Sequence, residues 1–174
     1  MVTVTTVDAP KLGDIGIVRT GGWFGSLIRW ADDCTVNHAV VYLGRWAGID
    51  EVMSAEPRGA RVRRVDEFGP IRWLRFEFPD PGNGPLAAAR WALRREGTPY
   101  NFLDDLAIGL VRKFGWHAPA ALIRRWSRKD RLQCAQLSDL ALQAGGVHAF
   151  TDGRPAGMVT PGDFERLANA QAGA

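Results

Sequence analysis

Cysteine is scarce in this sequence, since Cys34 and Cys134 are the only two in 174 residues. Two cysteines do not build a disulfide framework, and neither lies in a cluster of cysteine and histidine with the spacing of a zinc site. We therefore expect both thiols to be reduced, which leaves them available for chemistry. Neither a metal nor an organic cofactor is implied.

Long apolar runs are also missing. No stretch approaches the ~20 apolar residues of a membrane-spanning helix. The N-terminal residues do not combine a charged start with an apolar run, so they do not predict a secretory signal. We expect a protein that is cytoplasmic or associated with a phage particle.

The excess of positive charge is small. The formal net charge is +3, which is too low to predict nucleic-acid binding by itself. One basic run stands out, and it contains Arg124, Arg125, Arg128, Lys129 and Arg131. Such a run is either a solvated helix face or a surface that contacts an anionic partner, such as phospholipid headgroups, a wall polymer or nucleic acid.

The remaining composition, 46% hydrophobic and 24% charged, is typical of one ordered domain. We expect a flexible leader at residues 1–12 and a single domain at 13–170. Alternating, β-branched segments predict strands at 14–19, 38–43 (ended by Gly44), 50–55, 59–65 and 71–78. Helical spacing with proline and glycine at the ends predicts helices at 24–30, 85–96, 102–114, 119–129, 132–143 and 160–169. The fold class is α+β, with an antiparallel sheet packed against helices.

His38 opens the most regular of these strands, where it shares one face with Val40 and Tyr42. A histidine at the lip of a sheet can present its ring to a cleft while the strand holds it in place. The alternative is a partly exposed strand histidine without a chemical role.

Cys134 lies in the first turn of the helix expected at 132–143. The free N–H groups and the positive dipole end there favour a thiolate and could also bind an oxyanion. With a nearby histidine, this would make the nucleophile of a cysteine hydrolase. The alternative is a small buried cysteine in the core. Cys34 is a weaker candidate, because it lacks a helix N-terminus and lies only four residues before His38.

Six segments, taken in chain order, match short motifs of a known group of proteins. They are GDIGIVR at 13–19, NHAVVYLG at 37–44, EPRGARV at 56–62, GTPYN at 97–101, QCAQL at 133–137 and TPGDF at 160–164. Together they resemble the circularly permuted NlpC-like and YiiX-like cysteine hydrolases, relatives of the lecithin retinol acyltransferase family. The resemblance implies a papain-like fold in which the histidine precedes the cysteine, with His38 as base and Cys134 as nucleophile.

Two features depart from that family. Residues 135 and 136 are Ala and Gln where the family has Ser and Glu. The family's third catalytic member aligns with Ser54, but Glu56 would lie on the same face of an unbroken strand. We favour Glu56 over Ser54 as the group that orients His38; the alternative for Glu56 is a solvated turn carboxylate. By the same resemblance, Tyr100 is expected to line the cleft and to donate its hydroxyl to an oxyanion, unless it merely packs the helix junction.

The residues and the resemblance together predict a hydrolase of an amide or ester bond, acting on a cell-wall peptide or an acyl lipid. Cys134 would form an acyl-enzyme, and His38 would accept the thiol proton and later activate water. The changes at 135 and 136 favour an alternative, a domain that kept the fold but lost turnover. It would then serve as a structural or binding component, for example of a phage particle.

Overall fold

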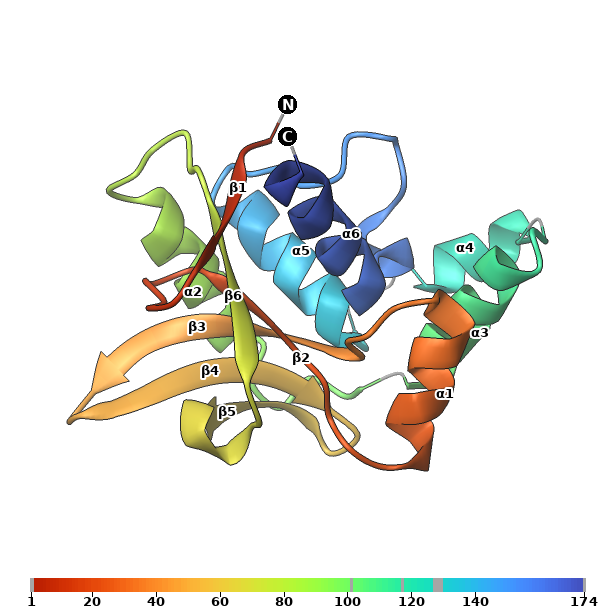
Figure 1. Ribbon diagram of the computed structural model, residues 1–174, viewed down its shortest axis with the longest axis horizontal. Helices are drawn as coiled ribbons and strands as arrows, with labels where there is room; N and C mark the ends of the chain where they lie inside the picture. Colours follow the sequence, from red (N-terminus) through yellow and green to blue (C-terminus); the bar gives the residue numbers. More distant parts are fainter. Residues whose placement is uncertain (1, 101, 117, 127–129, 174) are drawn as a thin grey trace.

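The computed structural model describes residues 2–100, 102–116, 118–126 and 130–173, which form an α+β domain (Figure 1). Within these residues, six antiparallel strands form one sheet in the order β1-β6-β2-β3-β4-β5. The strands are β1 (Val4–Val7), β2 (Ile15–Val18), β3 (His38–Trp46), β4 (Ile49–Glu56), β5 (Gly59–Arg64) and β6 (Ile71–Phe76). The helices are α1 (Trp23–Asp32), α2 (Gly84–Leu93), α3 (Phe102–Lys113), α4 (Ala120–Trp126), α5 (Cys134–Ala144) and α6 (Pro161–Ala172), with short 3-10 turns η1 (Val65–Glu67) and η2 (Ala156–Met158).

The predicted strands and helices are all present, with ends that shift by a few residues. The last part of the helix predicted at 119–129 lies outside the described residues. Helices α2, α5 and α6 lie together against the sheet, whereas α1, α3 and α4 gather at the end of the sheet where β3 begins (Figure 1). None of the described helices is long and apolar enough to cross a membrane.

The expectation of a flexible leader at 1–12 is wrong for its central part. β1 pairs with β6 along its whole length, with Val4 opposite Phe76. The side chain of Gln171 in α6 fastens this strand, because it accepts the N–H of Val4 at 2.6 Å and donates to the carbonyl of Val2 at 2.5 Å. The alternation of valine and threonine suits a strand, and β1 supplies partners for the backbone of β6 that would otherwise face solvent.

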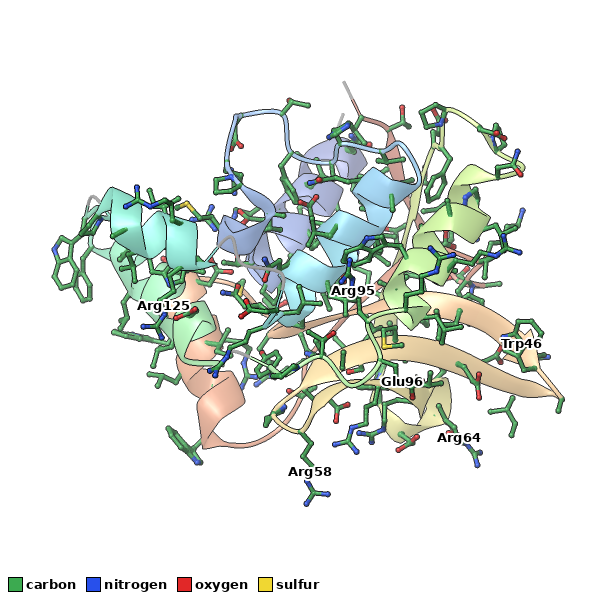
Figure 2. All side chains as sticks on the ribbon, turned by 180° about the vertical axis from the view of Figure 1, so that it is seen from behind. Trp46, Arg58, Arg64, Arg95, Glu96 and Arg125 are labelled. Atoms are coloured by element: carbon green, nitrogen blue, oxygen red, sulfur yellow. The ribbon has the colours of Figure 1, made fainter. Side chains whose placement is uncertain are left out.

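Gly44 does not end β3, as the sequence predicted. The strand continues to Trp46, and the register with β4 shifts between Tyr42 and Gly44. Gly44 has a φ of 105°, a conformation that only glycine adopts readily. The glycine therefore permits a β-bulge, and the hairpin of β3 and β4 extends beyond it with Trp46 at its tip (Figure 2).

Side chains of β3 alternate between the two faces of the sheet, and each face has its own core. Ala39, Val41 and Leu43 belong to the main core, which α5 covers. Val40 and Tyr42 pack on the opposite face with residues of β4 and β6. Because side chains along a strand alternate, His38 lies on the same face as Val40.

A buried ion cluster holds α6 in place. The Asp163 carboxylate accepts the N–H of Thr160, at 2.9 Å. It also receives both terminal nitrogens of Arg112 in α3 at 2.7 Å and forms ion pairs with Arg154 at 2.8 Å and Arg166 at 3.0 Å. Burial alone would raise the pKa of Asp163, but the hydrogen bonds and charges of these arginines hold it well below its usual range.

Candidate active site

A cavity of about 330 Å³ lies at the end of the sheet where β3 begins and β4 ends. Its walls come from the segment before and within α1, from the two strand ends, from the turn after η1 and from Tyr100. The lining residues are Thr20, Gly21, Gly25, Ile28, Asn37, His38, Ala55, Glu56, Pro57, Phe68 and Tyr100. The sequence singled out three of these, His38, Glu56 and Tyr100, and the fold brings all three to one cavity.

Asn37 fastens the wall opposite the strand ends. Its amide oxygen accepts the N–H of Thr20 and a guanidinium N–H of Arg29, both at 2.9 Å, and its amide nitrogen donates to the hydroxyl of Thr20 at 2.6 Å. A Cβ on Gly25 would lie 2.6 Å from that nitrogen, so the close approach of α1 requires glycine there. The wall beside His38 is therefore held rigidly.

His38 is held by a chain of hydrogen bonds along β4. Its Nε2 lies 2.8 Å from the hydroxyl of Ser54, and that hydroxyl lies 3.0 Å from Oε1 of Glu56. Glu56 forms an ion pair with Arg63 at 2.7 Å, so it can only accept. The single proton of Ser54 thus goes to Glu56, and Ser54 must accept from His38. The neutral ring therefore carries its proton on Nε2, and Nδ1 is left bare to accept one.

This arrangement differs from the expected role of Glu56. Ser54, the less favoured candidate, touches the histidine directly, and Glu56 acts on the ring only through Ser54. Ser54 and Glu56 do share one face of β4, as the alternation predicted. Register does not explain the difference: the strands are antiparallel and Val40 lies opposite Ser54, so His38 falls opposite Glu56. The ring instead reaches diagonally to Ser54, while the carboxylate of Glu56 pairs with Arg63.

Burial keeps the His38 ring neutral. The ring is only 8% exposed, and the loss of solvation, reinforced by the charge of Arg63, lowers the pKa of His38 from 6.5 to about 4. At neutral pH the ring is therefore a base and not an imidazolium ion. The ring is thus in the form that can accept a proton, although the lowered pKa makes it a weaker base than free histidine.

Because His38 is buried in its neutral form, acidification is expected to lower the free energy of unfolding. Between pH 6.5 and 4 the unfolded state binds a proton at residue 38 that the folded state does not, so stability falls as pH falls through this window. The loss amounts to about 3 kcal/mol at the acid end. Asp139 acts in the opposite sense, because burial raises its pKa to about 6. Urea denaturation of wild type and His38→Gln from pH 4 to 7 isolates the histidine, because both proteins contain Asp139 and the difference between their free energies of unfolding should change with pH only through residue 38. A difference that stays constant from pH 4 to 7 would contradict the effect of burial on His38.

Phe68 forms a wall that the sequence did not single out. Its ring stacks on that of His38, with centroids 6.1 Å apart and planes 20° apart, and the guanidinium of Arg63 lies 5.8 Å from the centre of the Phe68 ring. Phe68 follows η1 in a turn, where periodicity gives no signal. Arg61 and Arg63 alternate along β5 and could have been recognised as sharing a face.

Cys134 is the first residue of α5, so it lies in the first turn of this helix as the sequence predicted, and the residue is 1% exposed. The chain that leads into it is fixed to one cavity wall, because Leu132 forms a β-bridge with Tyr100 and donates its N–H to the carbonyl of Pro99 at 2.9 Å. Gln136 accepts the N–H of Gln133 at 3.3 Å and donates to the carbonyl of Trp126 at 3.3 Å. A neutral amide thus caps the first turn next to the cysteine.

Cys134 and His38 lie on opposite faces of the sheet. Cys134 packs in the main core with Ala55, whereas His38 shares its face with Val40. In the described part of the chain, the His38 ring forms a hydrogen bond with Ser54. Cys134 is not among the residues that line the cavity. The cavity nevertheless borders both faces of the sheet, because Ala55 and Tyr100, which pack in the main core with Cys134, also line it.

Cys34 is a poor nucleophile. Its thiol donates to the carbonyl of Val36 at 2.9 Å, and burial together with the charges of Asp32 and Glu165 raises its pKa to about 12. The thiol therefore stays protonated near neutral pH. This agrees with the expectation from the sequence that Cys34 is a weaker candidate for the nucleophile than Cys134.

The structure describes only part of the basic run at 124–131. Arg124 and Arg125 are exposed on α4, and Arg125 forms an ion pair with Asp104 at 3.6 Å (Figure 2). Arg131 is also exposed. Arg128 and Lys129 lie outside the described residues, so contact with an anionic surface stays a prediction.

Within the described residues, no three side chains of histidine, cysteine, aspartate or glutamate gather as metal ligands would. No family model matches the chain, and none of the curated proteins compared with it matches either.

Proposed function

We propose that the protein is a thiol hydrolase of the permuted papain-like type, with Cys134 as nucleophile and His38 as base. The observation that carries the proposal is the state of His38: a neutral ring at a cavity, with its proton held on Nε2 by Ser54 and with Nδ1 bare. This is the form of histidine that a nucleophile requires of its base. The position of Cys134 at the N-terminus of α5 supports the role of nucleophile.

In the proposed reaction, Nδ1 of His38 takes the thiol proton as the Cys134 sulfur attacks the carbonyl carbon of an ester or amide. The backbone N–H groups at the start of α5 and the Tyr100 hydroxyl donate to the oxyanion. The leaving alcohol or amine takes the proton from His38, and an acyl-enzyme remains. His38 then accepts a proton from water as the water oxygen attacks the acyl carbon. The carbon–sulfur bond breaks, the sulfur of Cys134 takes the proton back from His38, and the acid is released. The mechanism requires the Cys134 sulfur to reach Nδ1.

The substrate is proposed to be a cell-wall peptide amide or an acyl lipid. The apolar side chains of Ile28, Ala55, Pro57 and Phe68 in the cavity suit a hydrocarbon portion. Action in a cytoplasm or delivery with a phage particle is part of the same proposal.

A second function is favoured by one observation, the burial of Cys134. A thiol that is 1% exposed and absent from the cavity lining fits a domain that binds a ligand in the cavity without turnover. Such a domain would be a structural or binding component.

Alkylation by iodoacetamide at pH 7 distinguishes the two functions. A working hydrolase should be labelled at Cys134 faster than free cysteine, and His38→Gln should remove that advantage. Cys34 is the internal control: with a pKa of about 12 its thiolate is ~1000-fold rarer than that of an ordinary thiol, and its greater intrinsic reactivity restores part of this, so labelling should be about 30-fold slower than for free cysteine. Peptide mapping by mass spectrometry reads both sites. Labelling of neither cysteine before unfolding would favour the binding domain and contradict the hydrolase.

A further inference from the structure

A second hollow, of about 510 Å³, adjoins the cavity beside His38. The two share Glu56 and Pro57 as common walls. The other lining residues of this hollow, which we term the arginine groove, are Arg58, Arg61, Arg63 and Glu67. A ligand that fills the cavity can therefore extend past Pro57 into the arginine groove.

The charges in the arginine groove do not cancel. Arg63 is fully engaged, because it bonds Glu56 at 2.7 and 2.8 Å and Glu67 at 2.6 and 2.9 Å. Arg61 lies 3.4 Å from Glu56, and its buried Nε makes no hydrogen bond within the described residues. Three guanidinium groups thus face two carboxylates, and one positive charge is left over.

The surplus charge lies at Arg58. This side chain extends from the turn between β4 and β5 into solvent, and it forms no ion pair in the described part of the chain (Figure 2). Its neighbour Arg61 has donors to spare. A planar guanidinium with free N–H groups binds carboxylate and phosphate in preference to other anions.

We propose that the arginine groove is an anion subsite, so that the molecule recognised here has an apolar portion in the cavity and a carboxylate or phosphate held by Arg58 and Arg61. The inference names the substrate class of the proposed hydrolase and rests on that function for its meaning, but binding itself needs no turnover. The scissile carbonyl would then lie between the apolar portion beside His38 and the anionic group beyond Pro57.

Isothermal titration calorimetry of the wild-type chain with octanoate, octyl phosphate and octan-1-ol tests the subsite. The three ligands share one hydrocarbon chain and differ in the head group. The anions should bind about tenfold more tightly than the alcohol at low ionic strength, because hydrogen bonds to a charged group add to the burial of the chain. About 0.5 M NaCl should reduce this preference. Tighter binding of octanoate would indicate a ligand with a carboxylate, and tighter binding of octyl phosphate would indicate a ligand with a phosphate.

The double variant Arg58→Gln/Arg61→Gln should lose the preference for the anions. Arg64→Gln is the matched control, because Arg64 is exposed at the other end of β5, pairs with Asp66 and does not line the groove (Figure 2). Equal binding of octanoate and octan-1-ol to wild type, or a preference that survives in the double variant, would overturn the subsite. If Cys134 resists alkylation while the preference depends on the two arginines, the hydrolase fails and the subsite stands.

Discussion

Replacement of Cys134 by alanine is expected to reduce turnover at least about 1000-fold, because the proposed reaction has no other nucleophile that forms the acyl-enzyme. The residue is buried in the main core, and loss of one sulfur from a small side chain should leave the fold intact. The measurement is product formation from murein peptides and acyl lipids, read by mass spectrometry. Cys34→Ala is the matched control and should retain wild-type rates, because its thiol is protonated near neutral pH.

The His38→Gln variant should lose activity to a similar extent, and the double variant with Cys134→Ala should be no slower than either single variant. Groups that act as one unit show this lack of additivity. Product formed equally by wild type and Cys134→Ala would remove the cysteine from the mechanism. Independent, multiplying losses from the two changes would argue that His38 serves the fold and not the thiol.

Asp163→Asn is expected to lower the free energy of unfolding by about 3–5 kcal/mol, as when one partner of a buried ion pair is removed. The carboxylate is 5% exposed and is shared by Arg112, Arg154 and Arg166, so the amide leaves these three cations with only Asp32 and Asp152 as counter-charges. Such a loss is a large fraction of the stability of a typical domain. Urea denaturation at pH 7 measures it.

The matched control for this change is Asp152→Asn, because Asp152 also pairs with Arg154 but is half exposed. Exposed pairs contribute about 1 kcal/mol or less, so the control should stay close to wild type. The low pKa of Asp163 means that its contribution is present above pH 3.8 and is lost as pH falls below that value. Equal effects of the two changes would show that the ion cluster does not hold α6.

Element types could be predicted because the local patterns are strong, whereas contacts between elements could not. The alternation in β3 predicted that His38, Val40 and Tyr42 share a face, and they do: Val40 and Tyr42 pack in one cluster, and Phe68, which packs against that cluster, stacks on His38. It gave no indication of which face α5 would cover. The position of Cys134 relative to the His38 ring depends on which face α5 covers. The packing of whole helices against the sheet decides this, and no local sequence pattern contains it.

The errors have equally specific causes. β1 was missed because its strand pattern is only four residues long and depends on a partner, β6, that lies about 70 positions away along the chain. Gly44 was interpreted as a stop because a bulge and a turn both favour glycine with positive φ. The choice of Glu56 over Ser54 failed because the ring of His38 reaches diagonally to Ser54, while Arg63 of the next strand binds the carboxylate of Glu56. A single strand sequence does not contain these contacts between strands.

The clamp formed by Gln171 has a consequence for chain order. It holds the first strand against the last helix, so the two ends of the described chain lie together, as Figure 1 shows. A short added linker could close the chain into a ring, and the ring could be reopened in the exposed turn that runs through Asp80 and Gly82. The cysteine would then come before the histidine along the backbone while every neighbour in space stayed the same.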